Sequence, residues 1–139
     1  MVNLRENQWR HFRRRRPKLL TDKGGIHTIK TIALAHRKTG LTREEYNRYW
    51  LEKHGPLAAR LIPNVRRYVQ NHFIEVPGMV YEGDGIVEMW YDDVEAWQKS
   101  REAVFSSQEL GKDASNFCRM SPGGFWVVEE HVILDKTGK

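Results

Sequence analysis

The sequence has little of the chemistry that marks several large classes of protein. Cys118 is the only cysteine among 139 residues, which excludes an intramolecular disulfide and a thiolate-rich metal site. Arg119 beside it would lower the pKa of the thiol, but nothing else marks Cys118 as a nucleophile. No apolar run approaches the roughly 20 residues that cross a bilayer, and no apolar segment follows the charged N-terminus as in a secretory signal. These absences predict a single-domain cytoplasmic protein.

Motifs for metals and cofactors are also missing. His54 and His72 lie 18 positions apart, and no carboxylate stands at metal-ligand spacing from either on a shared helix face. The segment Gly83-Asp84-Gly85 lacks the preceding strand and following helix that a phosphate-binding loop requires. No histidine stands out as an axial ligand for haem. We therefore expect neither a metal nor a cofactor.

The excess of positive charge comes from the start of the chain. The net charge is +5, but residues 1–18 hold seven basic residues and one acid, which leaves the remaining 16 basic and 17 acidic residues at −1. An arginine-rich arm binds RNA, DNA or acidic lipid through phosphate contacts. A basic run alone is weak support, so a solvated arm, or one packed on a neighbouring subunit, is favoured over nucleic-acid binding by residues 5–18.

Composition and periodicity divide the chain into a basic extension over 1–25, a folded domain over 26–134 and a polar tail over 135–139. Thr42 and Glu45 form a capping box that begins a helix, and Gly55-Pro56 is expected to end it at His54. The predicted elements are a strand at 26–36, a helix from Thr42 with a further turn to Ile62, strands at 65–74 and 85–91, helices from 92 and across 108–117, and a strand at 125–134.

The order strand, helix, strand, strand, helix, strand predicts an α+β fold of the ferredoxin-like type. Its four-stranded antiparallel sheet has helices on one face, so the other face needs a cover. We expect that open face to carry Tyr68, Gln70 and His72 from the second strand, with Glu88 and Trp90 from the third. A second copy of the chain would cover the face and close a cavity between two sheets.

Three segments resemble the EthD family of the dimeric α+β barrel superfamily. They are Tyr49-Trp50 with His54-Gly55-Pro56-Leu57, the strand from Val65 to His72, and the strand from Asp84 to Asp92. The resemblance covers about residues 28–134 and implies a homodimer with a small-molecule cavity in each subunit. The superfamily includes cofactor-free isomerases, cyclases, dehydratases, decarboxylases and monooxygenases, as well as haem-dependent branches. The resemblance therefore implies the fold more firmly than the chemistry.

Histidine and tyrosine supply the acid–base chemistry that this sequence offers. An imidazole exchanges protons near neutral pH, and a tyrosine hydroxyl donates to a developing enolate oxygen. We expect His54 and His72 to share proton transfer, with Tyr68 as hydroxyl donor. The expected protein is a lyase or isomerase that dehydrates, decarboxylates, cyclises or shifts a double bond in an aromatic or polyketide-like carbonyl compound. The expected substrate contacts are Tyr49, Trp50, Phe73, Glu88, Trp90 and His36.

Each of these residues also has a plainer interpretation. His54 suits a helix C-terminus, where a cationic side chain is favoured, while His72 and the aromatic residues suit ordinary packing. Glu88 would pair with Lys30 or Arg67 across the sheet, or orient a histidine. Two other functions remain open: a cofactor-free monooxygenase that deprotonates a phenol before it meets oxygen, and a non-catalytic dimer that binds a small ligand.

Overall fold

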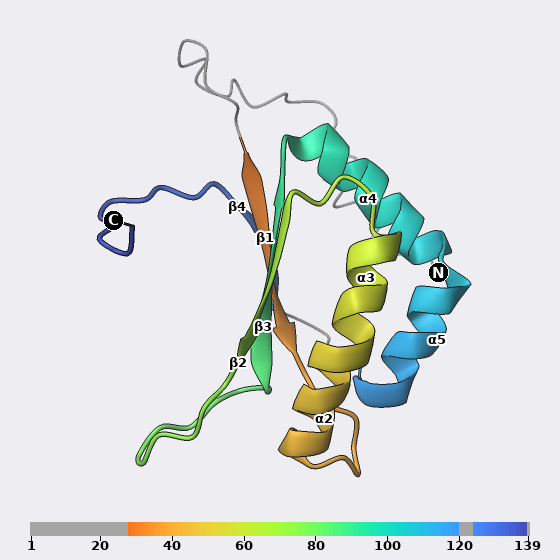
Figure 1. Cartoon of the computed structure of the whole chain (residues 1–139), viewed down its shortest axis with the longest axis vertical. Helices are drawn as coiled ribbons and strands as arrows, with labels where there is room; N and C mark the ends of the chain where they lie inside the picture. The colour runs from red at the N-terminus through yellow and green to blue at the C-terminus, as the bar shows by residue number, and fades with distance from the viewer. Residues whose placement is uncertain (1–27, 120–123, 139) are drawn as a thin grey trace, which may run out of the picture.

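A four-stranded antiparallel sheet with helices on one face forms the part of the chain that the computed structural model describes, residues 28–119 and 124–138 (Figure 1). The sheet order is β2-β3-β1-β4, with strands β1 (Ile29–Ala35), β2 (Arg67–His72), β3 (Gly85–Tyr91) and β4 (Phe125–Val128). The helical segments are α2 (Arg43–Tyr49), η1 (Trp50–His54), α3 (Gly55–Leu61), α4 (Val94–Ser106) and α5 (Gln108–Phe117). The predicted ferredoxin-like α+β fold is confirmed.

The observed helix and strand boundaries match the predicted ones best where local sequence signals are strong. Strand β3 and helix α5 match the predicted ranges, and the side chain of Thr42 accepts the backbone N–H of Glu45 in the expected capping box. The prediction of a strand over 125–134 is wrong in its second half, because β4 pairs only with β1 and stops at Val128. Strand β2 is likewise shorter than 65–74. The extension over 1–25, with its arginines, and residues 26 and 27 of the first predicted strand lie outside the described residues.

The first helix does not end at His54, and this prediction is corrected. The helical path continues through η1, a wider π-helical turn, into α3. Pro56 has no N–H to donate to the preceding turn, and as the second residue of α3 it occupies a position that tolerates this loss. Gly55 donates instead to the carbonyl of Trp50, five residues earlier. The Gly-Pro pair thus widens the helix without breaking it, and His54 does not cap a helix end.

Two buried clusters hold the helices on the sheet. One lies between β1, β3 and α4, and the other between the α2–η1 helix and α5. The first cluster contains Ile29, Tyr91 and Trp97, and the second contains Tyr46, Trp50 and Phe117. In the second cluster the ring of Tyr46 lies 5.5 Å from that of Trp50 and 5.4 Å from that of Phe117. These rings fix the position of the helix that borders the site described below.

Strand β2 faces the opposite way from the expectation. Tyr68, Gln70 and His72 point toward the helices, because their side chains contact Trp50. Placing them on the open face was wrong. The alternating set that starts at Arg67 lies there instead, with Arg67 across from Trp90 in the register of β2 and β3. Both sets mix polar and apolar residues, so alternation along β2 did not distinguish the two faces.

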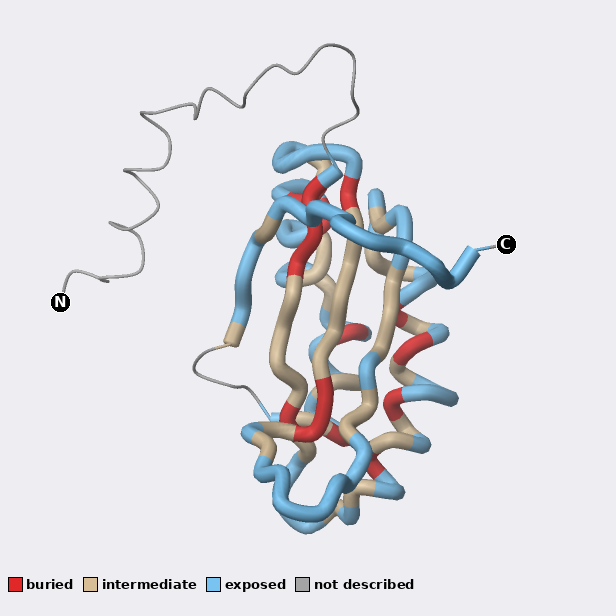
Figure 2. The backbone as a smooth tube through the Cα atoms, turned by 90° about the vertical axis from the view of Figure 1, so that its left-hand side faces the viewer, coloured by how far each residue is buried: buried red, intermediate tan, exposed pale blue. Residues whose placement is uncertain are grey.

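The open face carries Glu88 and Trp90, as predicted, around a buried lysine. Lys30 bonds to both Glu88 and Glu130, which confirms the pairing of Glu88 with Lys30. Burial opposes the charge of Lys30, but the bonds to the two carboxylates outweigh it and raise the pKa of the ammonium. The guanidinium of Arg67 lies 4.7 Å from the ring centre of Trp90. Figure 2 views this face, where the central strands are mostly half-buried.

Candidate functional site

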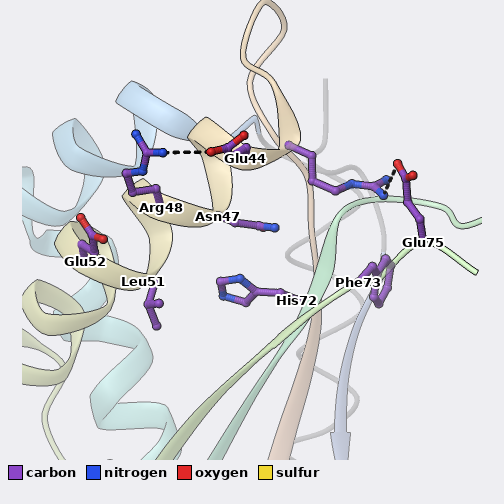
Figure 3. Close-up of a pocket in the computed structure, with 9 residues that line it drawn as sticks. Glu44, Asn47, Arg48, Leu51, Glu52, His72, Phe73 and Glu75 are labelled. Carbon is purple, nitrogen blue, oxygen red and sulfur yellow. Dashed lines mark hydrogen bonds and ion pairs between the residues drawn. The ribbon is translucent and has the colours of Figure 1, made fainter.

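A groove of about 500 Å³ opens between the α2–η1 helix and the end of β2 (Figure 3). Its lining residues are Arg43, Glu44, Asn47, Arg48, Leu51, Glu52, His72, Phe73 and Glu75. Charged side chains of both signs surround its mouth, and Arg48 pairs with Glu44 at 3.0 Å. His72 is the histidine that points into the groove from the sheet. The groove therefore offers an imidazole beside both polar and apolar contact surfaces.

The ring of His72 is held flat by a tryptophan. Its plane lies at 4° to that of Trp50, with 4.6 Å between ring centres. Gly85, directly opposite His72 in the sheet, makes room for the indole, since a Cβ on Gly85 would lie 2.7 Å from the Trp50 ring. Burial lowers the pKa of His72, so its neutral form is favoured. A neutral, fixed imidazole is the form that accepts a proton as a general base.

The amide of Gln70 determines which nitrogen of His72 is free. Nε2 of Gln70 lies 2.9 Å from the backbone carbonyl of Trp50, which accepts hydrogen bonds and cannot donate them. The oxygen of the same amide therefore faces His72, whose Nε2 lies 2.8 Å away and must donate. This fixes the proton of the neutral ring on Nε2 and leaves the lone pair on Nδ1. Nδ1 is thus the basic atom of the site.

Tyr68 supports this arrangement from behind. Its hydroxyl oxygen accepts from Nε2 of Gln70 at 3.0 Å and from the indole N–H of Trp50 at 3.3 Å. Burial raises the pKa of Tyr68, so the hydroxyl stays neutral. Tyr68 lines a separate hollow of about 150 Å³ between β2 and α3, and it is not among the residues that line the groove. The hydroxyl thus holds Gln70 and Trp50 in place.

Gly55 of the His-Gly-Pro block has a steric role in the same network. A Cβ at this position would lie 2.7 Å from Nε2 of Gln70 and 3.0 Å from the carbonyl oxygen of Trp50. Any side chain would therefore push the amide of Gln70 away from that carbonyl. The absence of a side chain at Gly55 allows strand β2 to dock on the π-helical turn.

His54 has different neighbours from His72. Its Nδ1 lies 2.7 Å from a carboxylate oxygen of Asp113 on helix α5, and its ring centre lies 4.7 Å from that of Phe117. The hydroxyl of Tyr49 donates to the other oxygen of Asp113 at 2.7 Å, which raises the pKa of the tyrosine. The side chains of His54 and Asp113 are partly buried, with 18% and 16% of their surface exposed. This His54–Asp113–Tyr49 network joins the α2–η1 helix to α5.

The structure does not bring the predicted site residues together. Among the described residues, His54 and His72 do not contact each other, because the ring of His54 lies against α5 and that of His72 lies on Trp50. Phe73 lines the groove beside His72, whereas Glu88 and Trp90 lie on the opposite face of the sheet. The other expected substrate contacts are not in the lining of the groove. Trp50 is buried in the core, Tyr49 donates to Asp113, and His36 is buried beside Gly83.

Cys118 differs from the expectation. Its thiol is partly buried and donates to the carbonyl of Ala114 at 3.1 Å. Burial raises the pKa of the thiol, so the predicted lowering by Arg119 is wrong. Cys118 packs against the cluster that contains Trp50 and is not activated for nucleophilic chemistry.

Sequence reasoning missed Asn47 in the groove and Asp113 beside His54. Asn47 stands in the middle of a short helix, where asparagine is a poor helix former, and this is a weak local signal. Asp113 precedes Phe117 by one helical turn, so the two share a face of α5, but the partner helix is not evident from that spacing. Each residue gains significance only from neighbours that lie far away in the sequence.

Residues 28–119 and 124–138 contain no group of three or more histidine, cysteine, aspartate or glutamate side chains arranged to hold a metal ion. None of the helices within these ranges combines the length and the hydrophobicity needed to cross a membrane.

Comparison with known proteins identifies relatives of this fold. The EthD domain model matches residues 38–121. An EthD-like protein of Ralstonia eutropha JMP134 superposes with a TM-score of 0.59 and 16% identity, over 81% of this chain and 98% of its own. An ethyl tert-butyl ether D (EthD) family protein of Bacillus halodurans C-125 gives 0.51 and 22%, over 75% and 99%. A NIPSNAP-like domain protein of Burkholderia xenovorans gives 0.52 and 14%, over 80% and 91%. No curated protein matches the sequence.

Proposed function

The chain belongs to the EthD domain family, and we propose that it is a cofactor-independent lyase or isomerase whose general base is His72. One observation carries the proposal: the imidazole lies flat on Trp50 at the groove with its Nε2 bound to Gln70, which leaves Nδ1 basic. The lowered pKa of His72 keeps this nitrogen unprotonated at neutral pH. The substrate is an aromatic or polyketide-like carbonyl compound.

The proposed reaction begins with proton removal beside the carbonyl. Nδ1 of His72 takes the proton, the C–H electron pair moves into the carbonyl, and an enolate forms. In the resulting imidazolium, the N–H at Nε2 still donates its hydrogen bond to the oxygen of Gln70. Return of the proton to another carbon shifts a double bond, and its delivery to a leaving hydroxyl releases water. Phe73 and Leu51 provide apolar surface for the rest of the substrate.

His54 and Tyr68 have supporting roles in this proposal. His54 is engaged with Asp113 and faces α5, so it does not share proton transfer with His72. Tyr68 orients Gln70 and Trp50, which together fix the ring of His72. The expected division of acid–base work between two histidines and a tyrosine is thereby reduced to one base and its supports.

Deuterium exchange tests the function directly. With 2-tetralone as the probe in D₂O buffer, we expect the wild-type protein to accelerate loss of the α-proton signal in NMR spectra. His72→Ala should remove about 100-fold or more of that acceleration, while the matched His54→Ala variant should keep most of it. Equal rates for His72→Ala and wild type would contradict the proposal. Oxygen consumption with a phenolic probe would instead favour the monooxygenase alternative.

The open face of the sheet suits a second copy of the chain. Trp126 pairs with Ile32 on that face and is 50% exposed, and Val80 and Ile133 are 97% and 92% exposed. The β2–β3 connection and the C-terminal segment both extend away from the helices on this side (Figure 1). A two-fold axis would let one copy cover the apolar side chains of the other. Sedimentation should give a dimer for wild type and a monomer for Trp126→Glu; a monomeric wild type would contradict this.

A further inference from the structure

Asn47 is a half-buried residue whose amide oxygen is buried without a hydrogen-bond partner. Its Oδ1 is shielded from solvent and accepts no hydrogen bond from any of the described residues. A buried polar atom left without a partner costs stability, and asparagine is a weak helix former in the middle of α2. An apolar residue of similar size would avoid both costs. Such a position is commonly explained by a binding or catalytic role.

Asn47 faces the same groove as the proposed base. Both Asn47 and His72 line the groove, one from helix α2 and the other from strand β2. Figure 3 shows the amide of Asn47, with its nitrogen at the tip, on the helix across the groove from the ring of His72. The amide nitrogen carries two N–H donors and accepts nothing. A donor on one wall and a base on the other can engage the oxygen and the adjacent carbon of one carbonyl compound.

The charged groups at the edge of the groove are three glutamates and two arginines, and both arginines are paired with carboxylates. Arg43, one helical turn before Asn47, is held by Asp84 at 3.4 Å and by the exposed Glu75 at 3.6 Å. Both contacts fix the guanidinium beside the groove, and the two carboxylates largely neutralise its charge, so among the lining residues the amide of Asn47 is the neutral side-chain donor opposite His72. Tyr68, the hydroxyl donor expected from the sequence, is not in the lining.

We propose that the amide N–H of Asn47 binds the carbonyl oxygen of the substrate and stabilises the enolate that forms when His72 removes the α-proton. This inference rests on the function proposed above and deepens it. The C–H bond breaks, its proton goes to Nδ1 of His72, and its electron pair ends on the oxygen that Asn47 holds. The substrate class follows: a planar ketone whose enolate oxygen and acidic carbon are adjacent, so that both walls are used at once.

Binding of 4-nitrophenol tests the role of Asn47 separately from turnover. Its anion is a planar mimic of an enolate, and its absorbance reports the ionisation state of the bound molecule. We expect wild type to bind the anion and to lower the pKa of the bound phenol. Asn47→Leu should weaken binding of the anion about tenfold, because one hydrogen bond to a charged oxygen is lost. Asn71→Leu, the same replacement on the open face of β2 and outside the groove, should bind it as wild type does.

Stability gives a second readout that a merely structural residue would not produce. Asn47→Leu should raise the midpoint of thermal unfolding, because it removes the unpartnered Oδ1, while lowering the rate of 2-tetralone exchange. Asn47→Asp keeps the size of the side chain and replaces its donor by a negative oxygen, so it should bind 4-nitrophenolate less well than Asn47→Leu.

The outcomes separate the two proposals. If Asn47→Leu binds the anion as tightly as wild type, or wild type does not bind it, the role of Asn47 is wrong. Loss of exchange in His72→Ala would in that case still support the base. If His72→Ala instead retains full exchange, the proposed function is wrong, whatever Asn47 binds.

Discussion

His54 and His72 are the same residue type, yet the structure places them in very different surroundings. His54 is bound to Asp113 and lies against Phe117, so it serves the contact between the α2–η1 helix and α5. His72 lies on Trp50, and its Nε2 is hydrogen-bonded to the neutral amide of Gln70. The difference teaches that the partners of an imidazole decide its role. A ring with a free nitrogen at a groove can act as a base, whereas one held by a carboxylate between two helices joins them.

The π-helical turn is what separates the two regions. Trp50 begins this turn and His54 ends it. The ring of Trp50 stacks on His72 and its carbonyl accepts from Gln70, while His54 bonds to Asp113 on α5. One local widening of the helix therefore serves two purposes, and replacement of the residues around it should affect the two regions unequally.

The largest effect is expected from Trp50→Ala, which removes the side chain shared by both regions. Trp50 is 2% exposed, and truncation of a buried tryptophan typically costs about 3–5 kcal/mol of unfolding free energy. Urea unfolding measures the loss. Leu51→Ala is the matched control, because Leu51 is 62% exposed and should change stability by less than about 0.5 kcal/mol. Equal losses for the two variants would show that Trp50 is not the shared support.

Asp113→Ala should affect the His54 region alone. It removes the acceptor of both His54 and Tyr49, so we expect a loss of about 2–3 kcal/mol in unfolding free energy with little change in 2-tetralone exchange. Glu109→Ala on the same helix is the control, since its pair with Arg60 is exposed and weak. A folded Asp113→Ala variant without exchange activity would mean that the two regions are not distinct.

Gln70→Leu should affect the His72 region with a smaller energetic consequence. Without the amide oxygen, the proton of the neutral ring is no longer fixed on Nε2. We expect the exchange rate to fall about tenfold, as for other residues that orient a histidine, with the affinity for 4-nitrophenolate largely retained. Asn71→Ala, the neighbour on the opposite face of β2, should leave the rate unchanged. A similar fall in both variants would indicate general damage to the strand.

The smallest effect is the pH dependence of stability. The folded protein lowers the pKa of His72, so below about pH 6.5 the unfolded chain binds the proton more readily than the folded one. The stability associated with neutral His72 is complete above that pH and decreases as the pH falls toward the folded pKa. Glu88 and Glu130, whose pKa values are also lowered, lose their contribution below about pH 4.5. Between pH 4.5 and pH 6.5, roughly, the free energy of unfolding from urea titrations should depend less on pH in His72→Ala than in wild type. The same pH dependence in both proteins would contradict the lowered pKa of His72.

Much of the fold could be predicted because its signals are local. Three of these signals depend only on neighbours in the chain. They are the capping box of Thr42 and Glu45, the apolar run of β3, and the residues at the two ends of α5. The order of these elements was then sufficient for the ferredoxin-like topology, and the His-Gly-Pro block for the family resemblance. The end of β4 was missed because pairing with β1, and not β propensity, decides where that strand stops.

The candidate site was predicted only in part. His72 and Phe73, both expected in the site, line the groove, whereas Tyr68 lies outside its lining and His54 is bound to Asp113. The prediction of which side chains of β2 face the helices was wrong. Both alternating sets of this strand contain polar residues, so hydrophobicity did not favour either set for the helix-covered face. The contact of Gln70 with the carbonyl of Trp50 decides the facing, and that carbonyl is available because the turn is π-helical.

The sequence by itself determined the elements, their order and the family, because capping, periodicity and glycine–proline punctuation act over a few residues. The tertiary structure alone decided which histidine is free, since this depends on groups that are distant in the chain: Asp113 for His54, and Trp50 and Gln70 for His72. Proton affinity and tautomer are set by burial and hydrogen-bond partners, and neither exists until the helices have packed on the sheet.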